Sequence, residues 1–213
     1  MGLIMKLNIV NKHEYEEQED YREIILKIPN QRERMERDFR YLGLDYNNLS
    51  IQDTHILNCE VIDKTDPSFS GAISTEISNI ISRAKDLGYT TPFQDIKKLF
   101  TIINTFNSKD KDKLLAILEC KEREISKMKD VIKFANNINC FELLEAYNEE
   151  DLARKLIYNN EIDIEDLMEY SDLQKLGRDI SIEQKILMTE QGYLRQNEEL
   201  KQEKIKEEEE EFE

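Results

Sequence analysis

The sequence predicts an α+β fold made of three small domains: an antiparallel sheet with a helix, a helical bundle and an acidic α/β unit. Apolar and polar residues alternate near the start of the chain, as in half-buried strands, and further on the apolar residues recur at helical spacing. Only 6 glycines and 3 prolines interrupt the 213 residues, a composition that favours helices. Hydrophobic residues make up 39% and charged residues 36%, so the apolar surface has to be divided among thin cores.

The first domain is expected over residues 1–62. Alternate positions are apolar in residues 5–10, and a second strand of similar character is expected over 22–28. Residues 31–42 carry apolar side chains at helical spacing, and β-branched and apolar residues return at 55–62. These patterns predict an antiparallel sheet covered by one helix.

A helical middle domain is expected over residues 63–122. Its first part, residues 63–71, is rich in turn-forming residues and is expected to be a loop. Thr91 followed by Pro92 predicts an N-cap with proline at the first helical position, and Ser108 is placed to cap a further helix. Apolar side chains recur at helical spacing through this domain and indicate a core: Ile73, Ile77, Ile80, Ala84, Leu87, Phe93, Ile96, Phe100, Ile103 and Phe106.

The third domain, residues 123–197, is expected to combine short helices and strands. Ser126 is placed to cap a helix, residues 138–144 fit a strand, and Asn148 is placed to cap a helix whose first turn is acidic. The remaining residues, 198–213, are almost purely charged. They are expected to form either a solvated helix or a disordered acidic tail.

The chain is strongly acidic, and its charge is unevenly distributed. The formal net charge is −16, from 46 acidic and 30 basic residues, which argues against direct binding of DNA or RNA. Between residues 142 and 172 only Arg154 and Lys155 oppose eleven acids: Glu142, Glu145, Glu149, Glu150, Asp151, Glu161, Asp163, Glu165, Asp166, Glu169 and Asp172. Charge alone leaves two interpretations open, a solvated acidic face or a surface shaped to be bound by a basic cleft.

The sequence carries no signature of catalysis or of a cofactor. His13 and His55 are the two histidines, and with three scattered cysteines they form no spacing typical of a metal site. A glycine-rich phosphate loop is also absent from the sequence, so we expect no metal, no cofactor and no enzymatic activity. The odd number of cysteines, without a signal peptide or a long apolar run, predicts free thiols in a reducing cytoplasm and no membrane span.

Two groups of charged residues are interpreted as structural. Gly177-Arg178-Asp179 is expected to be a tight turn fixed by charge-assisted hydrogen bonds rather than a catalytic motif. The basic residues of the segment 32–40 are expected to pair with neighbouring acids of the same helix rather than to contact nucleic acid. These basic residues are Arg32, Arg34, Arg37 and Arg40, and the acids are Glu33, Glu36 and Asp38.

The segment LQKLGRDISIEQKILMTEQGYL (173–194) resembles the C-terminal signature of the ArdA-type antirestriction family. In that signature an acidic and aromatic segment leads into a Leu/Tyr-Gly-Arg-Asp core and closes at Thr-x-x-Gly-Tyr. The matching residues are Tyr170, Asp172, Leu176, Gly177, Arg178, Asp179, Thr189, Gly192 and Tyr193.

Two further segments are similar to this family. Residues 128–157 resemble a helix, a turn and an acidic helix, with Asn137-Ile138-Asn139 where the family usually shows Asn-Leu-Asp. Residues 22–56 resemble a strand, a Leu-Pro turn, a helix and a second strand, although Thr54-His55 replaces Tyr-Glu. The likeness is weak through 57–122. The losses of acids at Asn139 and His55 thin the negative surface and leave a different target enzyme open.

The resemblance implies a protein of mobile genetic elements that is elongated, has three small domains and dimerises through its C-terminal region. Its carboxylates would follow the path of phosphates on a bent B-form duplex. As such a DNA mimic it would fill the DNA cleft of a type I restriction–modification enzyme, chiefly the methyltransferase core. The thin cores indicated by the apolar pattern suit a long shape.

Other function classes stay open. An acidic interaction or scaffold protein would use the same charge, with residues 198–213 as a partner-binding helix. An inhibitor of a different DNA-binding defence enzyme would also fit. A small enzyme of unknown type is the least favoured class, because no local catalytic signature supports it.

Overall fold

The chain folds into two compact units. The computed structural model describes residues 3–17, 21–49, 53–120, 123, 125–162 and 172–197. Unit 1 comprises Met1–Asn107 and Glu124–Asn136, and unit 2 comprises Ser108–Arg123 and Asn137–Glu213. Each unit contains a three-stranded antiparallel sheet with helices, so the predicted α+β class is confirmed.

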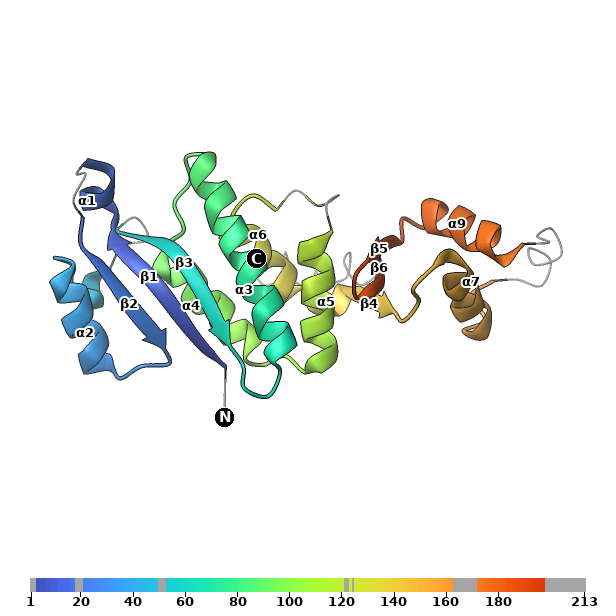
Figure 1. Ribbon diagram of the computed structural model, residues 1–213, viewed down its shortest axis with the longest axis horizontal. Helices are drawn as coiled ribbons and strands as arrows, with labels where there is room; N and C mark the ends of the chain where they lie inside the picture. The colour runs from blue at the N-terminus through green and yellow to red at the C-terminus, as the bar shows by residue number, and fades with distance from the viewer. Residues whose placement is uncertain are drawn as a thin grey trace, which may run out of the picture. The chain divides into compact units, whose positions relative to one another are not determined.

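The sheet of unit 1 has the strand order β2-β1-β3 (Figure 1). Its strands are β1 (Ile4–Asn11), β2 (Glu23–Ile28) and β3 (Thr54–Ile62), and the short helix α1 (Lys12–Glu17) follows β1. Leu7 lies opposite Leu26 on one neighbour and Cys59 on the other. All three side chains are buried, which confirms the alternation seen in the sequence.

Helices pack against this sheet and against one another. They are α2 (Arg32–Tyr41), the 3₁₀ turn η1 (Tyr46–Asn48), α3 (Pro67–Asp86), α4 (Phe93–Ile103) and α6 (Met128–Asn136). Figure 1 shows α3 running alongside β3, and the two are joined by hydrogen bonds of Ser74 and Ser78 to the backbone of β3. Phe39 of α2 packs on Phe93 of α4, with ring centroids 5.1 Å apart. The helical stripes of the sequence form a core as predicted, except that Leu87 is 60% exposed and Phe106 is half-buried, because both lie beyond the last residue of their helix.

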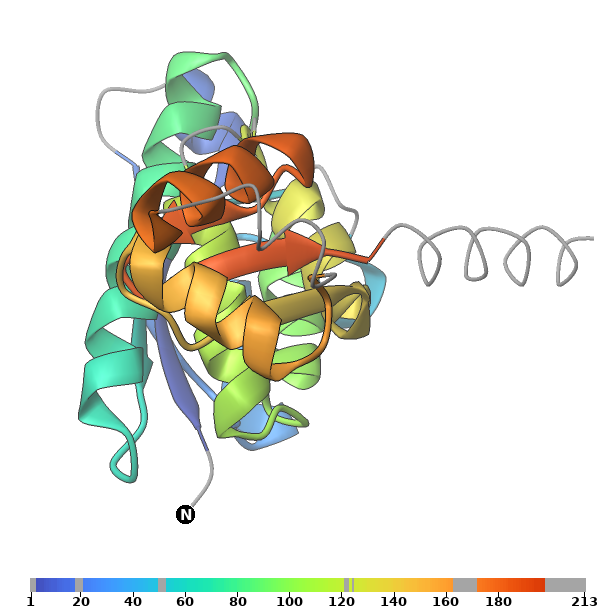
Figure 2. The same cartoon turned by 90° about the vertical axis from the view of Figure 1, so that its right-hand side faces the viewer.

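Unit 2 is built from shorter elements. They are α5 (Ser108–Glu119), η2 (Ile138–Cys140), β4 (Phe141–Leu144), α7 (Glu149–Tyr158), α9 (Leu173–Glu183), β5 (Leu187–Thr189) and β6 (Gly192–Gln196). The sheet order is β4-β6-β5, and α7 packs against α9 (Figure 2). Its core includes Leu144, Leu152, Leu156, Ile186 and Tyr193.

The three-domain arrangement predicted from the sequence is not confirmed. The expected boundaries, 1–62, 63–122 and 123–197, separate elements that the structure groups together, because α3 and α4 belong to unit 1 with the sheet. Helix α5 instead belongs to unit 2. Helix α3, which was expected in the middle bundle, packs against β3.

Two local predictions in the middle section were wrong. The expected loop over 63–71 contains the start of α3, where the Asp66 carboxylate accepts from Phe69 N (3.1 Å) and Pro67 takes the first turn. Thr91 does not cap α4, because its side chain is buried and Thr54 Oγ1 of β3 accepts from Phe93 N (3.1 Å). Sequence patterns did not show a cap supplied by a different strand.

None of the helices within the described residues combines the length and the apolar character that crossing a membrane requires. The prediction for the tail 198–213 lies outside the described residues.

Candidate acidic surface

Most of the negative charge of the chain belongs to unit 2. Unit 2 contains 27 acidic and 14 basic residues, a net charge of −13, whereas unit 1 contains 19 acidic and 16 basic residues, a net of −3. Seven of the eleven predicted surface acids are described: Glu142, Glu145, Glu149, Glu150, Asp151, Glu161 and Asp172. Asp163, Glu165, Asp166 and Glu169 lie outside the described residues, and so does Tyr170, so their placement stays a prediction.

The acidic helix α7 begins where the sequence predicted. The Asn148 side chain accepts from Asp151 N (2.8 Å), and its amide donates to the Asp151 carboxylate (3.0 Å). Glu149, Glu150 and Asp151 occupy the first turn, where the positive end of the helix dipole favours carboxylates. Part of this acidity therefore stabilises the start of the helix.

Two of these acids form exposed ion pairs. Glu150 accepts from Arg154 one turn later in α7 (2.5 Å), and Glu149 lies 3.9 Å from Arg178 of α9. The side chains of Glu150 and Arg154 are each more than half exposed. Exposed pairs of this kind contribute about 0–1 kcal/mol, so a partner with a denser array of cations can replace them at little cost.

Arg195 of β6 binds two of the predicted acids at once. Its guanidinium donates to Glu142 of β4 (2.5 Å) and also to Glu161, which follows α7. The hydrogen bond from Arg195 holds the pKa of Glu161 below its usual value. The Arg195 side chain is only 22% exposed, so this arginine is better shielded than Arg154 and Arg178 of the other two pairs. It joins the sheet to the end of α7.

The cluster around Arg195 was not predicted from the sequence. Its members lie far apart along the chain, and the acids at 142 and 161 look the same in the sequence as their neighbours. The pattern of strand pairing, with Glu142 opposite Arg195, is what brings them together. Two acids that were expected to face a partner are thus held by a cation of the same unit.

Gly177-Arg178-Asp179 is part of helix α9, so the predicted tight turn was wrong. Gly177 is buried against the first turn of α7, and a Cβ atom there would lie 1.8 Å from the Glu149 carbonyl oxygen. Leu176 is also buried, and Arg178 makes the long contact with Glu149 described above. The glycine allows the two helices to approach closely.

The second pair matched in the family resemblance, Gly192 and Tyr193, begins β6 directly after the turn at residues 190–191 of the β5–β6 hairpin. Gly192 has φ +130°, and a Cβ atom there would lie 2.6 Å from the Leu144 carbonyl oxygen. Thr189 Oγ1 donates to the Gly192 carbonyl (2.8 Å) and accepts from Gln191 N (3.2 Å). Tyr193 is buried in the core of unit 2, and burial raises its pKa.

The acids that stay available are fewer than the sequence count indicates. Within the described residues, Glu145 is exposed and makes no ion pair, and Asp172 is exposed but accepts from Gln174 N (2.9 Å) at the start of α9. Of residues 137–213, the described part carries 10 acids and 6 bases. Most of the excess negative charge therefore belongs to residues 163–171 and 198–213.

His55 and the three cysteines are buried in the fold. His55 is buried, its Nδ1 accepts from Thr91 N (3.2 Å), and burial lowers its pKa. All three cysteines are free and buried, and burial raises the pKa of the Cys59 thiol to about 12. Within the described residues, His, Cys, Asp and Glu side chains form no cluster that could hold a metal ion.

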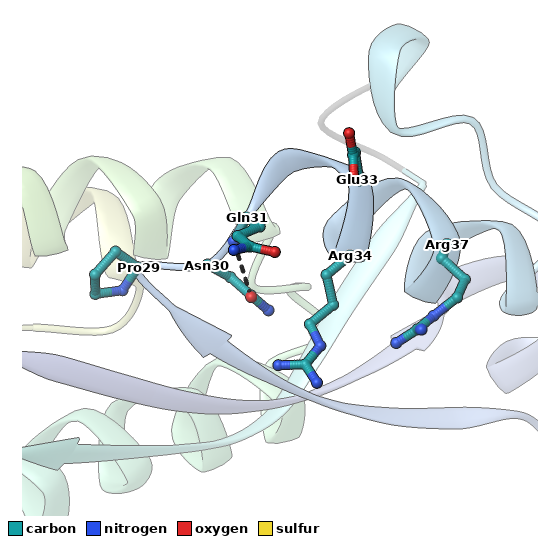
Figure 3. A pocket seen from close by; sticks show the side chains of 6 residues that line it. All are labelled: Pro29, Asn30, Gln31, Glu33, Arg34 and Arg37. Carbon is teal, nitrogen blue, oxygen red and sulfur yellow. Dashed lines mark hydrogen bonds between the residues drawn. The ribbon is translucent and has the colours of Figure 1, made fainter.

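The basic side of α2 includes two arginines that form ion pairs with acids of the same helix. Arg32 pairs with Glu36 (2.8 Å) and Arg37 with Asp38 (3.3 Å), so the predicted pairing is confirmed for these two. Figure 3 shows Arg34 and Arg37 extending to one side of the helix, while Glu33 points the other way. Both arginines and Glu33 line an open pocket of about 670 Å³ together with Pro29, Asn30 and Gln31. This polar, open lining differs from the enclosed apolar sites that bind small molecules.

Comparison with known proteins adds no relative. No protein-family model matches the chain, and a search of curated proteins gives no significant match. The likeness to the ArdA-type family therefore stays a prediction from the residues quoted above.

Proposed function

We propose that this chain is a non-enzymatic antirestriction protein. Its unit 2 would act as a DNA mimic and occupy the DNA-binding cleft of a type I restriction–modification enzyme, chiefly the methyltransferase core. The observation that carries the proposal is the segregation of charge, −13 in unit 2 against −3 in unit 1. The resemblance of 173–194 to the ArdA signature supplies the class of target. The proposal places the protein in the cytoplasm, where that target acts.

Electrostatics explains how such an inhibitor works. A DNA-binding cleft is lined with lysine and arginine, and much of its affinity comes from neutralising a line of phosphates. A surface of carboxylates gains the same attraction and the same fast, steered association. Because it carries no bases, it competes with DNA of any recognition sequence, without a cofactor and without contacting nucleic acid itself.

The ion pairs decide which carboxylates would contact the cleft. The acids bound by Arg195 share one cation, so they are assigned to holding unit 2 together, although the Glu142 side chain is 49% exposed. Glu149 and Glu150 have exposed, exchangeable partners and can turn toward a cleft at low cost. Glu145 and the acids of 163–169 would supply the remaining contacts.

A second candidate function is favoured by the same ion pairs. Four of the seven described acids already have an arginine partner, which is more typical of a solvated acidic face than of a strip of free carboxylates. In that case the chain is an acidic interaction or scaffold protein that binds through residues 198–213. Deleting 198–213 separates the two, because a mimic keeps most of its inhibition and a scaffold loses its partner.

A plating assay tests the proposed function. Cells that carry a type I restriction system are challenged with unmodified phage, and expression of the chain is expected to raise the plating efficiency. A triple variant with Glu145→Lys, Glu165→Lys and Glu169→Lys is expected to lose at least about tenfold of this protection, because each reversal adds repulsion from the basic cleft.

The matched control makes the same three charge changes in unit 1, at Glu17, Glu33 and Asp86, which are all exposed. This variant has the same net charge as the first but leaves unit 2 intact. Equal loss in both triple variants would mean that only the total charge matters. Absence of protection by the unaltered chain would contradict the antirestriction proposal.

A further inference from the structure

The sheet of unit 1 has two edges that differ in their hydrogen bonding. The edge at β3 is covered, since Val61 N donates to Ser74 Oγ (2.8 Å), Ser78 Oγ donates to the Cys59 carbonyl (3.2 Å) and Ile56 N donates to the Thr91 carbonyl (3.0 Å). The other edge is β2, which pairs only with β1. Within the described residues, no backbone group of β2 makes a hydrogen bond on its outer side.

Helix α2 lies near this edge but makes no hydrogen bond to the backbone of β2 within the described residues. It covers the buried side of β2, where Leu26 is 0% exposed. An open edge of this kind presents a row of backbone donors and acceptors to another strand.

Two copies of β2 have complementary charges when they run antiparallel to each other. Its exposed side chains are Glu23, Ile25 and Lys27, with the apolar residue between an acid and a base. In an antiparallel pair of two β2 strands centred on Ile25, each Glu23 lies opposite a Lys27. Ile25 then meets its own copy, and Ile24 lies opposite Leu26 on the buried side.

The exposed side chains of β2 are available for this pairing. Ile25 is 66% exposed, although it is a large β-branched side chain in the middle of a strand. Lys27 makes no ion pair within the part of the chain that the structure describes. Glu23 receives one hydrogen bond, from Asn8 Nδ2 to its Oε1 (2.6 Å), which leaves the other carboxylate oxygen for a lysine.

We infer that β2 is a self-association surface, at which two copies of this chain join their unit 1 sheets into one six-stranded antiparallel sheet. A two-fold axis through Ile25 makes the interface isologous, with two Glu23–Lys27 pairs flanking the Ile25 contact. The occupant is a second copy, because the order of charges along β2 complements itself and needs no other partner.

This surface is separate from the acidic unit and from the proposed function. The resemblance to the ArdA family implies a dimer through the C-terminal region, which belongs to unit 2. The β2 pairing instead uses only unit 1. Failure of the inhibition assay would leave it untouched, and failure of the β2 pairing would leave the antirestriction proposal untouched.

Substitutions that reverse the charges of Glu23 and Lys27 test the inference. Sedimentation equilibrium on the full chain, over a concentration series up to about 1 mM, gives the dissociation constant of self-association. Glu23→Lys and Lys27→Glu are each expected to weaken association by about tenfold or more, because like charges then face each other twice. The double variant with both changes is expected to regain the original constant.

Mixing the two single variants gives a still stronger test. Each single variant is self-repelling, but the two complement each other, so the mixture is expected to form a heterodimer where neither forms a homodimer. Glu60→Lys is the matched control, since Glu60 is exposed on the same sheet at the β3 side, with its own partner Lys6 (2.8 Å). It is expected to leave the constant unchanged.

Hydrogen exchange followed by mass spectrometry locates the contact. The β2 amides are expected to exchange more slowly as the concentration of the unaltered chain rises, and to lose this protection in Glu23→Lys. A chain that stays monomeric throughout the series overturns the inference. So does a dimer that responds equally to Glu60→Lys, that ignores both β2 variants, or that the double variant fails to restore.

Discussion

The two units of this chain share an architecture and differ in what stabilises it. Unit 1 has strands of 8, 6 and 9 residues with a large aliphatic core, whereas the strands of unit 2 have 4, 3 and 5 residues. The small unit carries the larger net charge, −13 against −3. It therefore relies on close backbone contacts at glycines and on one arginine that binds two acids. In this chain the unit with the shorter strands is therefore also the more acidic one.

The largest expected effect is at the contact of α7 and α9. Gly177→Ala places a Cβ atom against the Glu149 carbonyl oxygen, so the two helices must separate, and we expect the free energy of unfolding to fall by about 3 kcal/mol or more. Gly71→Ala is the control, because it is also helical but a Cβ atom there meets nothing within 4 Å. That variant should gain up to about 1 kcal/mol in urea unfolding. Equal values for the two would refute the close approach of α7 and α9.

The sequence predicted the elements that depend on contacts between neighbouring residues, and it missed those that depend on residues far apart along the chain. Periodicity predicted β1 and α2 correctly, because alternation and helical spacing are local, and Asn148 was correctly placed as a cap. The cap of α4 by Thr54 could not be predicted, since it comes from a strand 39 residues away along the chain.

The candidate site was predicted less completely than the fold. Counting acids marked the segment 142–172 as negative, but it did not show which of these acids have arginine partners. Arg195 contacts residues 53 and 34 positions away, and only the strand pairing reveals this. Gly177 was assigned a turn because glycine beside a charged pair is typical of turns, whereas here it serves a helix crossing.

A middle-sized effect is expected at the arginine cluster. Arg195→Gln leaves Glu142 and Glu161 facing each other without their cation, and we expect a loss of about 1–2 kcal/mol in the free energy of unfolding. Arg154→Gln removes a single exposed pair with Glu150 and is expected to cost less than about 0.5 kcal/mol. Similar losses in both variants would mean that the Arg195 cluster is no stronger than an ordinary surface pair.

The smallest effect is a difference in pH dependence between the units. The pKa of His55 in unit 1 is lowered by burial, so folding opposes its protonation, and stability should fall as pH drops through about 6.5. The pKa of Glu161 in unit 2 is lowered by Arg195, so its contribution is present above about pH 4.3 and is lost as pH falls further. The urea midpoint of His55→Asn should therefore change less between pH 7.5 and pH 5.5 than that of the unaltered chain. An unchanged slope would exclude His55 as its source.

The most direct test of the central claim is displacement of DNA from a purified type I methyltransferase core. A fluorescently labelled duplex is bound to the enzyme, and its anisotropy is followed as the chain is added at several salt concentrations. We expect the chain to displace the duplex whatever its sequence, with an affinity that falls steeply as salt rises. Absence of displacement, or displacement that is indifferent to salt, would contradict the claim that unit 2 takes the place of DNA.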